Sequence, residues 1–274
     1  MAVVTISDPD DPRVALYRDQ TDAALRRSVE AEHGIFMAEG ATLLRQVLAG
    51  DRHRIRSVLL HPVRHAALAG ALATVDPDVP VYLADPKVMD RIAGFSIHRG
   101  VLAAVERPPS IPAATLLRGM AAEGKTVAVL EAITDHENVG AVFRNAAAFG
   151  VGAILACTRT CDPLYRRSVR VSMGYVLAVP FARLDPWPAA LADVVAAGFR
   201  ILALTPAPDA TELRDLTADT NGRPDAVLLG TEGDGLSDAA LAAADVRVRI
   251  PMAGGVDSLN VATAAALAFH HLRS

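Results

Sequence analysis

Cysteine, aromatic residues and lysine are all scarce in this chain, and each shortage excludes some kinds of site or core. The two cysteines, Cys157 and Cys161, form a C-x3-C pair without the further ligands that a zinc site needs. We therefore expect ordinary reduced thiols and no metal. Aromatic residues make up only 4% of a chain that is 51% hydrophobic, so the core must consist mainly of Ala, Val, Leu and Ile.

Long apolar runs are also missing. None approaches the roughly 18 to 20 residues of a membrane-spanning helix, and the N-terminus lacks the basic-then-apolar layout of a signal peptide. We expect a globular, cytoplasmic protein with no membrane partner. Its 274 residues suggest two domains rather than one.

Positive charge comes almost entirely from arginine, because Lys87 and Lys125 are the only lysines. The net charge of −4 argues against a protein that coats nucleic acid by electrostatics alone. Arginine clusters such as "RRSVR" match phosphate well, although most such clusters are simply solvated surface. They favour a local contact with RNA or DNA only weakly.

A proline-rich segment, "ERPPSIPAATLLRGMAAEGKT", separates two parts of the chain that each alternate strand and helix patterns. We place a linker at 106–122, between a small α/β domain at 1–105 and a larger domain at 123–274. In the small domain, strands are predicted at 34–40, 54–62, 79–85 and 100–108, and helices at 13–30, 40–49, 62–74 and 86–93.

The larger domain repeats strand, polar loop and helix. This alternation predicts an α/β fold with a mostly parallel sheet covered on both faces. Ligands bind beyond the carboxyl ends of the strands in such sheets, so the loops after the strands are the places to search. The predicted strands are 126–133, 152–158, 174–182, 199–206, 225–230 and 246–251.

The loop and helix at 132–150 carry Asn138 on the way into the helix, and Arg144 on the less apolar side of the helix. A purely structural interpretation makes Asp135 or Asn138 the N-cap and Arg144 a solvated residue.

The loop after the strand at 225–230 has its glycines in the order G-x-x-G-x-G, starting at Gly230. This is neither the dinucleotide-binding order nor a phosphate loop, and the central Glu232 would repel a pyrophosphate. We therefore disfavour NAD and ATP, and an oxidoreductase with them. Glu232 suits an anchoring hydrogen bond or an arginine partner, and the structural alternative is a plain glycine turn.

The third loop follows Pro251 and contains Gly254 and Gly255. Ser258 occupies the position expected for an N-cap before an alanine-rich helix at 259–272. A helix with so little polar surface belongs either to the core or to an interface.

Taken together, "NVGAVFRNAAAFG", "LLGTEGDGL" and "IPMAGGVDSLNVATAAALA" resemble the three signature motifs of the SpoU, or TrmH-like, branch of the SPOUT RNA methyltransferases. The resemblance covers the whole C-terminal domain. The segment "GIFMAEGATLLRQVL" is similar, more weakly, to the companion domain of many of these enzymes, which resembles ribosomal protein L30e and binds RNA.

The resemblance implies methyl transfer from S-adenosylmethionine to a ribose 2′-hydroxyl of RNA, leaving S-adenosylhomocysteine. It also implies a deep trefoil knot, which no hydrophobic pattern reveals, and a homodimer formed through the first and last helices of the catalytic domain. The segment "CDPLYRRSVRVSMGYVLAVP" is similar to members that act on ribosomal RNA, so 23S rRNA is the expected target. The alternatives are the same chemistry on tRNA and a non-catalytic RNA-binding protein.

The matching positions imply individual roles. Arginine stays protonated at neutral pH, so we expect Arg144 to grip a phosphate and stabilise developing alkoxide charge rather than to act as a base. Asn138 would orient the ribose, and Glu232 would hold Arg144 or Asn138 in place. The implied catalytic set is Asn138, Arg144, Glu232, Ser258 and Asn260; the cofactor set is Thr205, Gly230, Ile250 and Leu259; the RNA-binding set is Arg166, Arg167 and Arg170.

Overall fold

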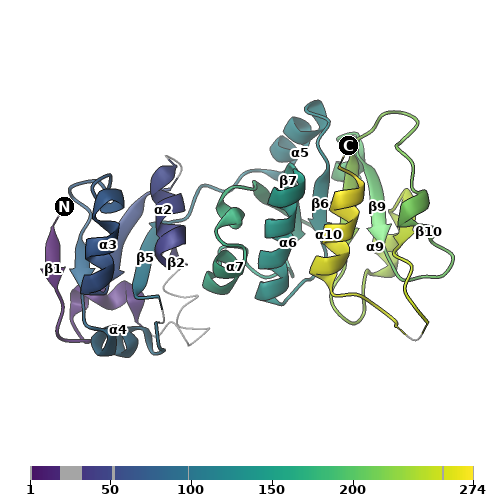
Figure 1. Cartoon of the computed structure of the whole chain (residues 1–274). Coiled ribbons are helices and arrows are strands. Elements are labelled where there is room, and N and C mark those ends of the chain that lie inside the picture. Colours follow the sequence, from purple (N-terminus) through teal and green to yellow (C-terminus); the bar gives the residue numbers. More distant parts are fainter. Residues whose placement is uncertain (1, 19–32, 51–52, 98, 255, 274) are drawn as a thin grey trace. The chain divides into compact units, whose positions relative to one another are not determined.

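The computed structural model describes residues 2–18, 33–50, 53–97, 99–254 and 256–273 (Figure 1). The chain forms two compact units, Met1–Pro109 with Leu164–Arg166, and Ser110–Pro163 with Arg167–Ser274. The boundary after Pro109 falls within the expected linker, but the second half of that segment is a helix, α5 (Ala113–Ala122). Its Leu116 and Leu117 are buried in the core of the second unit, so this half is not a linker.

The first unit contains a mixed five-stranded sheet in the order β1-β4-β3-β5-β2. The strands predicted in this part of the chain are all present, and the edge strand β1 is an addition that the sequence pattern did not indicate. Of the helix expected at 13–30, the structure describes only a short 3-10 helix, because residues 19–32 lie outside the described part. The elements are β1 (Val3–Thr5), η1 (Pro12–Tyr17), β2 (Ile35–Glu39), α2 (Ala41–Ala49), β3 (Ile55–Leu60), α3 (Pro62–Leu72), β4 (Val81–Leu83), α4 (Pro86–Ala93) and β5 (Val101–Glu106).

The second unit contains a seven-stranded sheet in the order β10-β12-β9-β11-β6-β7-β8, in which every pairing is parallel. This confirms the α/β fold with a mostly parallel sheet. The strands are β6 (Val127–Leu130), β7 (Ala153–Cys157), β8 (Phe181–Leu184), β9 (Arg200–Leu204), β10 (Thr211–Glu212), β11 (Asp225–Leu229) and β12 (Val246–Arg249). The helices are α5, α6 (His136–Phe149), α7 (Arg166–Val171), α8 (Leu191–Ala196), α9 (Asp238–Ala242) and α10 (Val261–His271), with short 3-10 helices η2 (Tyr175–Leu177) and η3 (Leu213–Asp215).

The strand predicted at 174–182 is wrong over its first half. Tyr175–Leu177 forms the 3-10 helix η2, and β8 begins only at Phe181. The buried residues Val176 and Val179 are three positions apart, as in one helical turn, while Tyr175 at the start of η2 is exposed. The hydroxyl of Ser172 also accepts the Val176 N–H, which favours a turn over an extended chain.

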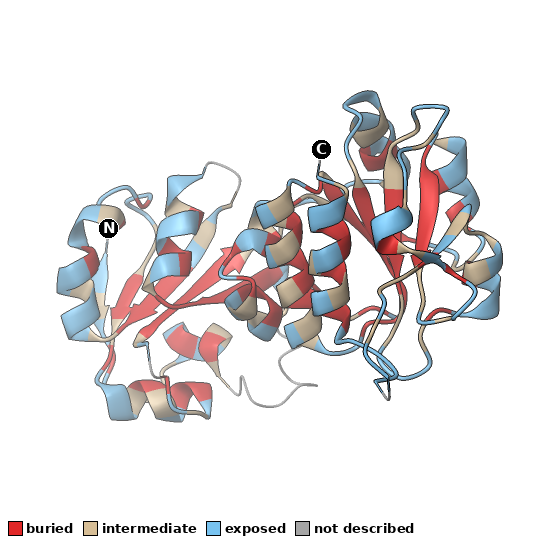
Figure 2. Cartoon of the chain, turned by 45° about the vertical axis from the view of Figure 1, so that its right-hand side comes forward, coloured by how far each residue is buried: buried red, intermediate tan, exposed pale blue. Residues whose placement is uncertain are grey.

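Helices cover both faces of the parallel sheet (Figure 1). Residues of α5, α8 and α9 pack with the sheet in one apolar cluster. On the other face α6 and α10 lie side by side, joined where the Asn145 side chain donates to the Ala262 carbonyl at 2.8 Å. Buried residues lie mainly in the strands and on the inward sides of the helices (Figure 2). No helix in the described ranges is long and apolar enough to cross a membrane.

The start of α6 approaches the following helix, α7, so closely that only glycine fits. A Cβ on Gly140 would lie 2.6 Å from the Ser168 carbonyl oxygen and 3.0 Å from the Val171 Cβ. A real Cβ does not tolerate such contacts, so Gly140 fixes how near α7 comes to the first turn of α6.

We expect Gly140→Ala to lower the free energy of unfolding by about 1–3 kcal/mol, because the added methyl overpacks this contact. Urea unfolding would measure the change. Gly119→Ala is the matched control, since Gly119 also lies in a helix but a Cβ there meets nothing within 4 Å. Equal stability of the two variants would contradict the packing argument.

Candidate active site

Three polar loops lie at the carboxyl ends of strands of the parallel sheet. They follow β6, β11 and β12, and the strand order β12-β9-β11-β6 places all of them at one edge of the sheet. In a parallel sheet this is the edge at which ligands bind. The three sequence motifs therefore come from distant parts of the chain to one place.

The third loop ends in a cap on α10. Asn260 is the N-cap: its Oδ1 accepts the backbone N–H groups of Ala262 at 2.9 Å and Thr263 at 3.3 Å. The expectation that Ser258 caps this helix is therefore wrong, because the helix begins later than predicted, at Val261. Ser258 is exposed in the loop before the cap.

The cap fixes the direction of a chain of side-chain hydrogen bonds. Because the oxygen of Asn260 faces the helix N–H groups, its Nδ2 faces outward and donates to Asn138 Oδ1 at 2.8 Å. The oxygen of Asn138 is then an acceptor, and its Nδ2 donates to Glu232 Oε1. Asn138, Glu232 and Asn260 thus form one polar cluster in which the backbone determines every donor and acceptor.

Asn138 is free for this role because another residue caps α6. Asp135 is the N-cap and accepts the Glu137 N–H at 2.8 Å. Asn138 lies in the first turn, where its side chain reaches the other two motifs. The simple capping interpretation therefore holds for Asp135 and is wrong for Asn138.

The second loop folds back on its own first residue. A Cβ on Gly230 would lie 2.4 Å from the Gly235 carbonyl carbon and 2.5 Å from the Leu236 nitrogen, so no other residue fits there. Thr231 and Gly235 form a β-bridge across the turn. This closed turn presents Glu232 toward Asn138, so it is more than a plain glycine turn.

Arg144 is not brought to this cluster within the chain. It lies about 1.7 turns after Asn138 in α6, on a different side of the helix, and is exposed. In the described part of the chain it has no hydrogen-bond or ion-pair partner. Of the two partners expected for Glu232, the structure shows Asn138.

The four residues expected to hold a cofactor border the same edge. Gly230 follows β11, Ile250 follows β12, and Thr205 follows β9, with its N–H donating to the Val248 carbonyl at 2.9 Å. Leu259 precedes the cap of α10 and is 36% exposed, an apolar side chain in a polar loop.

The three arginines expected to bind RNA have different surroundings. Arg167 is exposed and donates to Glu137 at 2.6 and 2.8 Å, and Arg170 is exposed. The side chain of Arg166 is only 15% exposed, donates to Glu39 at 2.6 Å, and lies over the Phe95 ring at 4.1 Å. The guanidinium of Arg166 therefore already has protein partners in Glu39 and Phe95, and its contact with RNA stays a prediction.

The model of the SpoU rRNA methylase family matches residues 125–270, which span the sheet edge and all three loops. A tRNA/rRNA methyltransferase of Mycobacterium tuberculosis strain H37Rv, itself uncharacterized, is 45% identical over 268 residues, covering 98% of this chain and 91% of that protein. The chain belongs to the SpoU rRNA methylase family.

Solved structures of SpoU-family proteins share the fold. The AdoMet-bound rRNA methyltransferase from Sinorhizobium meliloti superposes with a TM-score of 0.82 at 26% identity, covering 99% of this chain and 97% of that one. The SpoU methyltransferase AviRb from Streptomyces viridochromogenes gives a TM-score of 0.78 at 23% identity, with 96% of each chain covered. At 23% identity, the likeness to AviRb supports the fold alone.

The two thiols of this SpoU-family chain lie near the first loop. Cys157 is buried and its Sγ accepts the Ala132 N–H at 3.1 Å. Burial raises the pKa of Cys161 to about 12, so its thiol is protonated at neutral pH. Among the described residues, no group of three or more His, Cys, Asp or Glu side chains is arranged to hold a metal.

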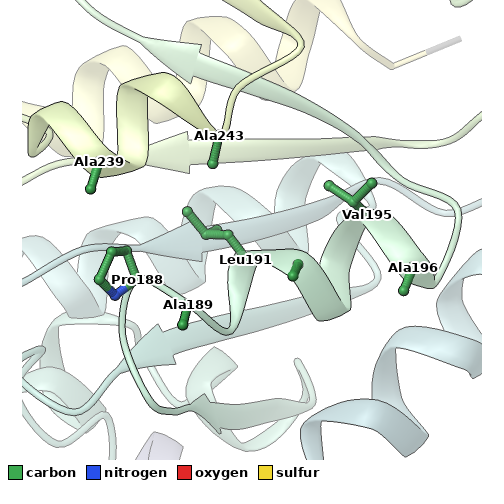
Figure 3. A pocket seen from close by; sticks show the side chains of 8 residues that line it. Pro188, Ala189, Leu191, Val195, Ala196, Ala239 and Ala243 are labelled. Atoms are coloured by element: carbon green, nitrogen blue, oxygen red, sulfur yellow. The ribbon is translucent and has the colours of Figure 1, made fainter.

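An apolar, largely open cavity of about 650 Å³ lies between α8 and α9 (Figure 3). Leu191, Val195, Ala239 and Ala243 are among the residues that line it, and none of its lining residues is titratable. None belongs to the three motifs, so the cavity is not part of the candidate active site.

Alanine substitution should show whether Asn260 or Ser258 caps α10. We expect Asn260→Ala to lower the free energy of unfolding by about 1 kcal/mol, because two N–H groups of α10 lose their acceptor. Ser258→Ala is the matched control and should leave stability unchanged. Urea unfolding of both variants checks this, and an equal loss in Ser258→Ala would restore Ser258 as the cap.

Proposed function

We propose that this chain transfers a methyl group from S-adenosylmethionine to a ribose 2′-hydroxyl of RNA, with 23S rRNA as the first candidate substrate. The observation that carries the proposal is the bonded cluster of Asn138, Glu232 and Asn260, which unites the three motifs at the ligand-binding edge of the sheet. The named relatives act on tRNA or rRNA, and the Sinorhizobium meliloti rRNA methyltransferase binds AdoMet.

The charges of the loops fit this cofactor. Glu232, Asp234 and Asp257 are exposed on the second and third loops, an arrangement that would repel a pyrophosphate and attract a sulfonium cation. Backbone groups at Gly230 and Ile250 would hold the adenosine part, while the exposed Leu259 offers an apolar contact for the adenine ring. Thr205 would form a further wall.

The cofactor supplies an activated methyl group on a leaving group that departs neutral, so the protein needs chiefly to align the ribose and to manage one proton. Asn138 keeps one amide hydrogen and one lone pair beyond its two bonds, with which it would orient the ribose. Glu232 and Asn260 would hold that amide still. Arg144 would contact the adjacent phosphate and stabilise negative charge as the hydroxyl loses its proton. Ser258 would complete the polar wall.

Arg144 would reach the ribose in a homodimer. Because it lies on a different side of α6 from Asn138, a second copy packed against α6 and α10 would bring its own Arg144 to the site. Exposed apolar residues support an interface here: Leu267 on α10 is 44% exposed, Met173 just before η2 is 46% exposed, and Tyr175 at the start of η2 is 42% exposed. The family resemblance adds the trefoil knot around the loops, which stays a prediction.

RNA would be held by exposed arginines of the second unit, Arg167 and Arg170, together with the first unit, for which we propose an L30e-like RNA-binding role. The alternative substrate is tRNA, because the relatives are named as tRNA/rRNA methyltransferases. A non-catalytic RNA-binding protein would not need the bonded cluster.

Purified protein should transfer a labelled methyl group from S-adenosylmethionine to bacterial rRNA. Digestion and mass spectrometry should then identify a 2′-O-methylated nucleoside. A base-methylated nucleoside would contradict ribose chemistry, and methylation of tRNA alone would reverse the substrate assignment. Transfer to neither RNA, with no cofactor binding by calorimetry, would favour the non-catalytic alternative.

Arg144→Ala should lower kcat by about 100- to 1000-fold, because the developing negative charge loses its stabilising cation. Arg118→Ala is the matched control, since Arg118 is exposed on α5, which packs on the other face of the sheet. Single-turnover methyl transfer and RNA binding would be measured for both. Full transfer with unchanged RNA affinity in Arg144→Ala would show that the assignment is wrong.

A further inference from the structure

Glu131 is a buried carboxylate that has no role in the mechanism above. It follows β6 directly, at the same sheet edge as the three motifs, and is 2% exposed. Burying a carboxylate is costly unless its oxygens accept hydrogen bonds. The hydrogen-bond partners of Glu131 therefore indicate which segments this side chain holds in place.

The two oxygens of Glu131 hold two different loops. Oε1 accepts the indole N–H of Trp187 at 2.7 Å, in the loop after β8. Oε2 accepts the backbone N–H of Ser237 at 3.0 Å, at the end of the loop after β11. Arg159, in the loop after β7, adds a peripheral contact of 3.5 Å to Oε1. One side chain thus joins the end of β6 to the loops that follow β7, β8 and β11.

The bond to Ser237 anchors the glycine-rich loop 230–237. The loop starts at Gly230, which packs against the backbone of Gly235 and Leu236. Within the loop, Glu232 Oε1 accepts a hydrogen bond from Asn138 Nδ2. The other end is held by the burial of Leu236, by Ser237 as the N-cap of α9, whose Oγ accepts the Ala240 N–H at 3.3 Å, and by the Glu131–Ser237 bond. Of these contacts, the bond to Glu131 is the one that links this end of the loop to the end of β6.

We infer that Glu131 is a positioning residue for methyl transfer: it holds loop 230–237 in the shape that places Gly230 against the cofactor and Glu232 against Asn138. The inference rests on the proposed function of this site. Because Glu131 is buried, it would act through the Ser237 backbone rather than by contact with substrate or cofactor.

Glu131→Gln tests the inference with little change in shape. Glutamine offers one oxygen and one NH2 group, so one of the two N–H donors would face another donor. We expect the KM for S-adenosylmethionine to rise about 10- to 100-fold, the effect of losing a hydrogen bond to a charged group, with a smaller change in kcat. A variant that was only less stable would have fewer active molecules, which lowers kcat and leaves KM unchanged. Trp187 is the only tryptophan, so its emission should also shift.

Asp225→Asn is the matched control. Asp225 is also a shielded carboxylate, paired with Arg200 at 2.7 Å, but it lies at the opposite end of β11. It should lower stability and leave the KM for S-adenosylmethionine within about twofold.

Glu131→Asp serves as a second variant, because it keeps the buried charge but is one methylene too short to reach both loops. An unchanged KM in either folded variant, or an equal rise in Asp225→Asn, would overturn the inference. Wild-type protein assayed in parallel separates the two proposals. Without methyl transfer by the wild type the proposed function fails, whereas transfer with an unaltered KM in the Glu131 variants removes only the role of Glu131.

Discussion

The site depends on a single constraint, the need of the first N–H groups of α10 for an acceptor. Asn260 meets it, and in doing so turns its amide so that the nitrogen faces Asn138. The polarity of the remaining bonds follows, through Asn138 to Glu232. A helix terminus thereby sets the orientation of side chains that come from three separate loops.

Close backbone packing fixes the positions of these loops relative to one another. Glycine at 140 lets α7 approach the first turn of α6, and glycine at 230 lets the second loop fold onto itself. The bond from Asn145 to the Ala262 carbonyl ties α6 to α10 just beyond the cluster. The alanine-rich composition of the chain suits such contacts, because small side chains allow helices and turns to come near each other.

Much of the architecture could be predicted from the sequence where apolar residues form short runs bounded by glycine or proline. The prediction for 174–182 was wrong over its first half because a short continuous apolar run is compatible with a buried strand as well as with a helical turn. Asn138, Glu232 and Asn260 were singled out as polar residues in loops after strands. Glu131 and Asn145 were not, because one ends a buried strand and the other lies in the middle of a helix, where no local pattern indicates a partner.

The sequence by itself determined the alternation of strands and helices, the parallel sheet and the three polar loops, because these depend on local hydrophobic periodicity and on residues that break it. Only the tertiary structure decided that Asn260 rather than Ser258 caps α10, that Glu232 binds Asn138, that Arg166 pairs with Glu39, and that Glu131 joins separate loops. These are contacts between residues distant in the chain. Their donors and acceptors are identified only when the sheet has brought the ends of its strands together.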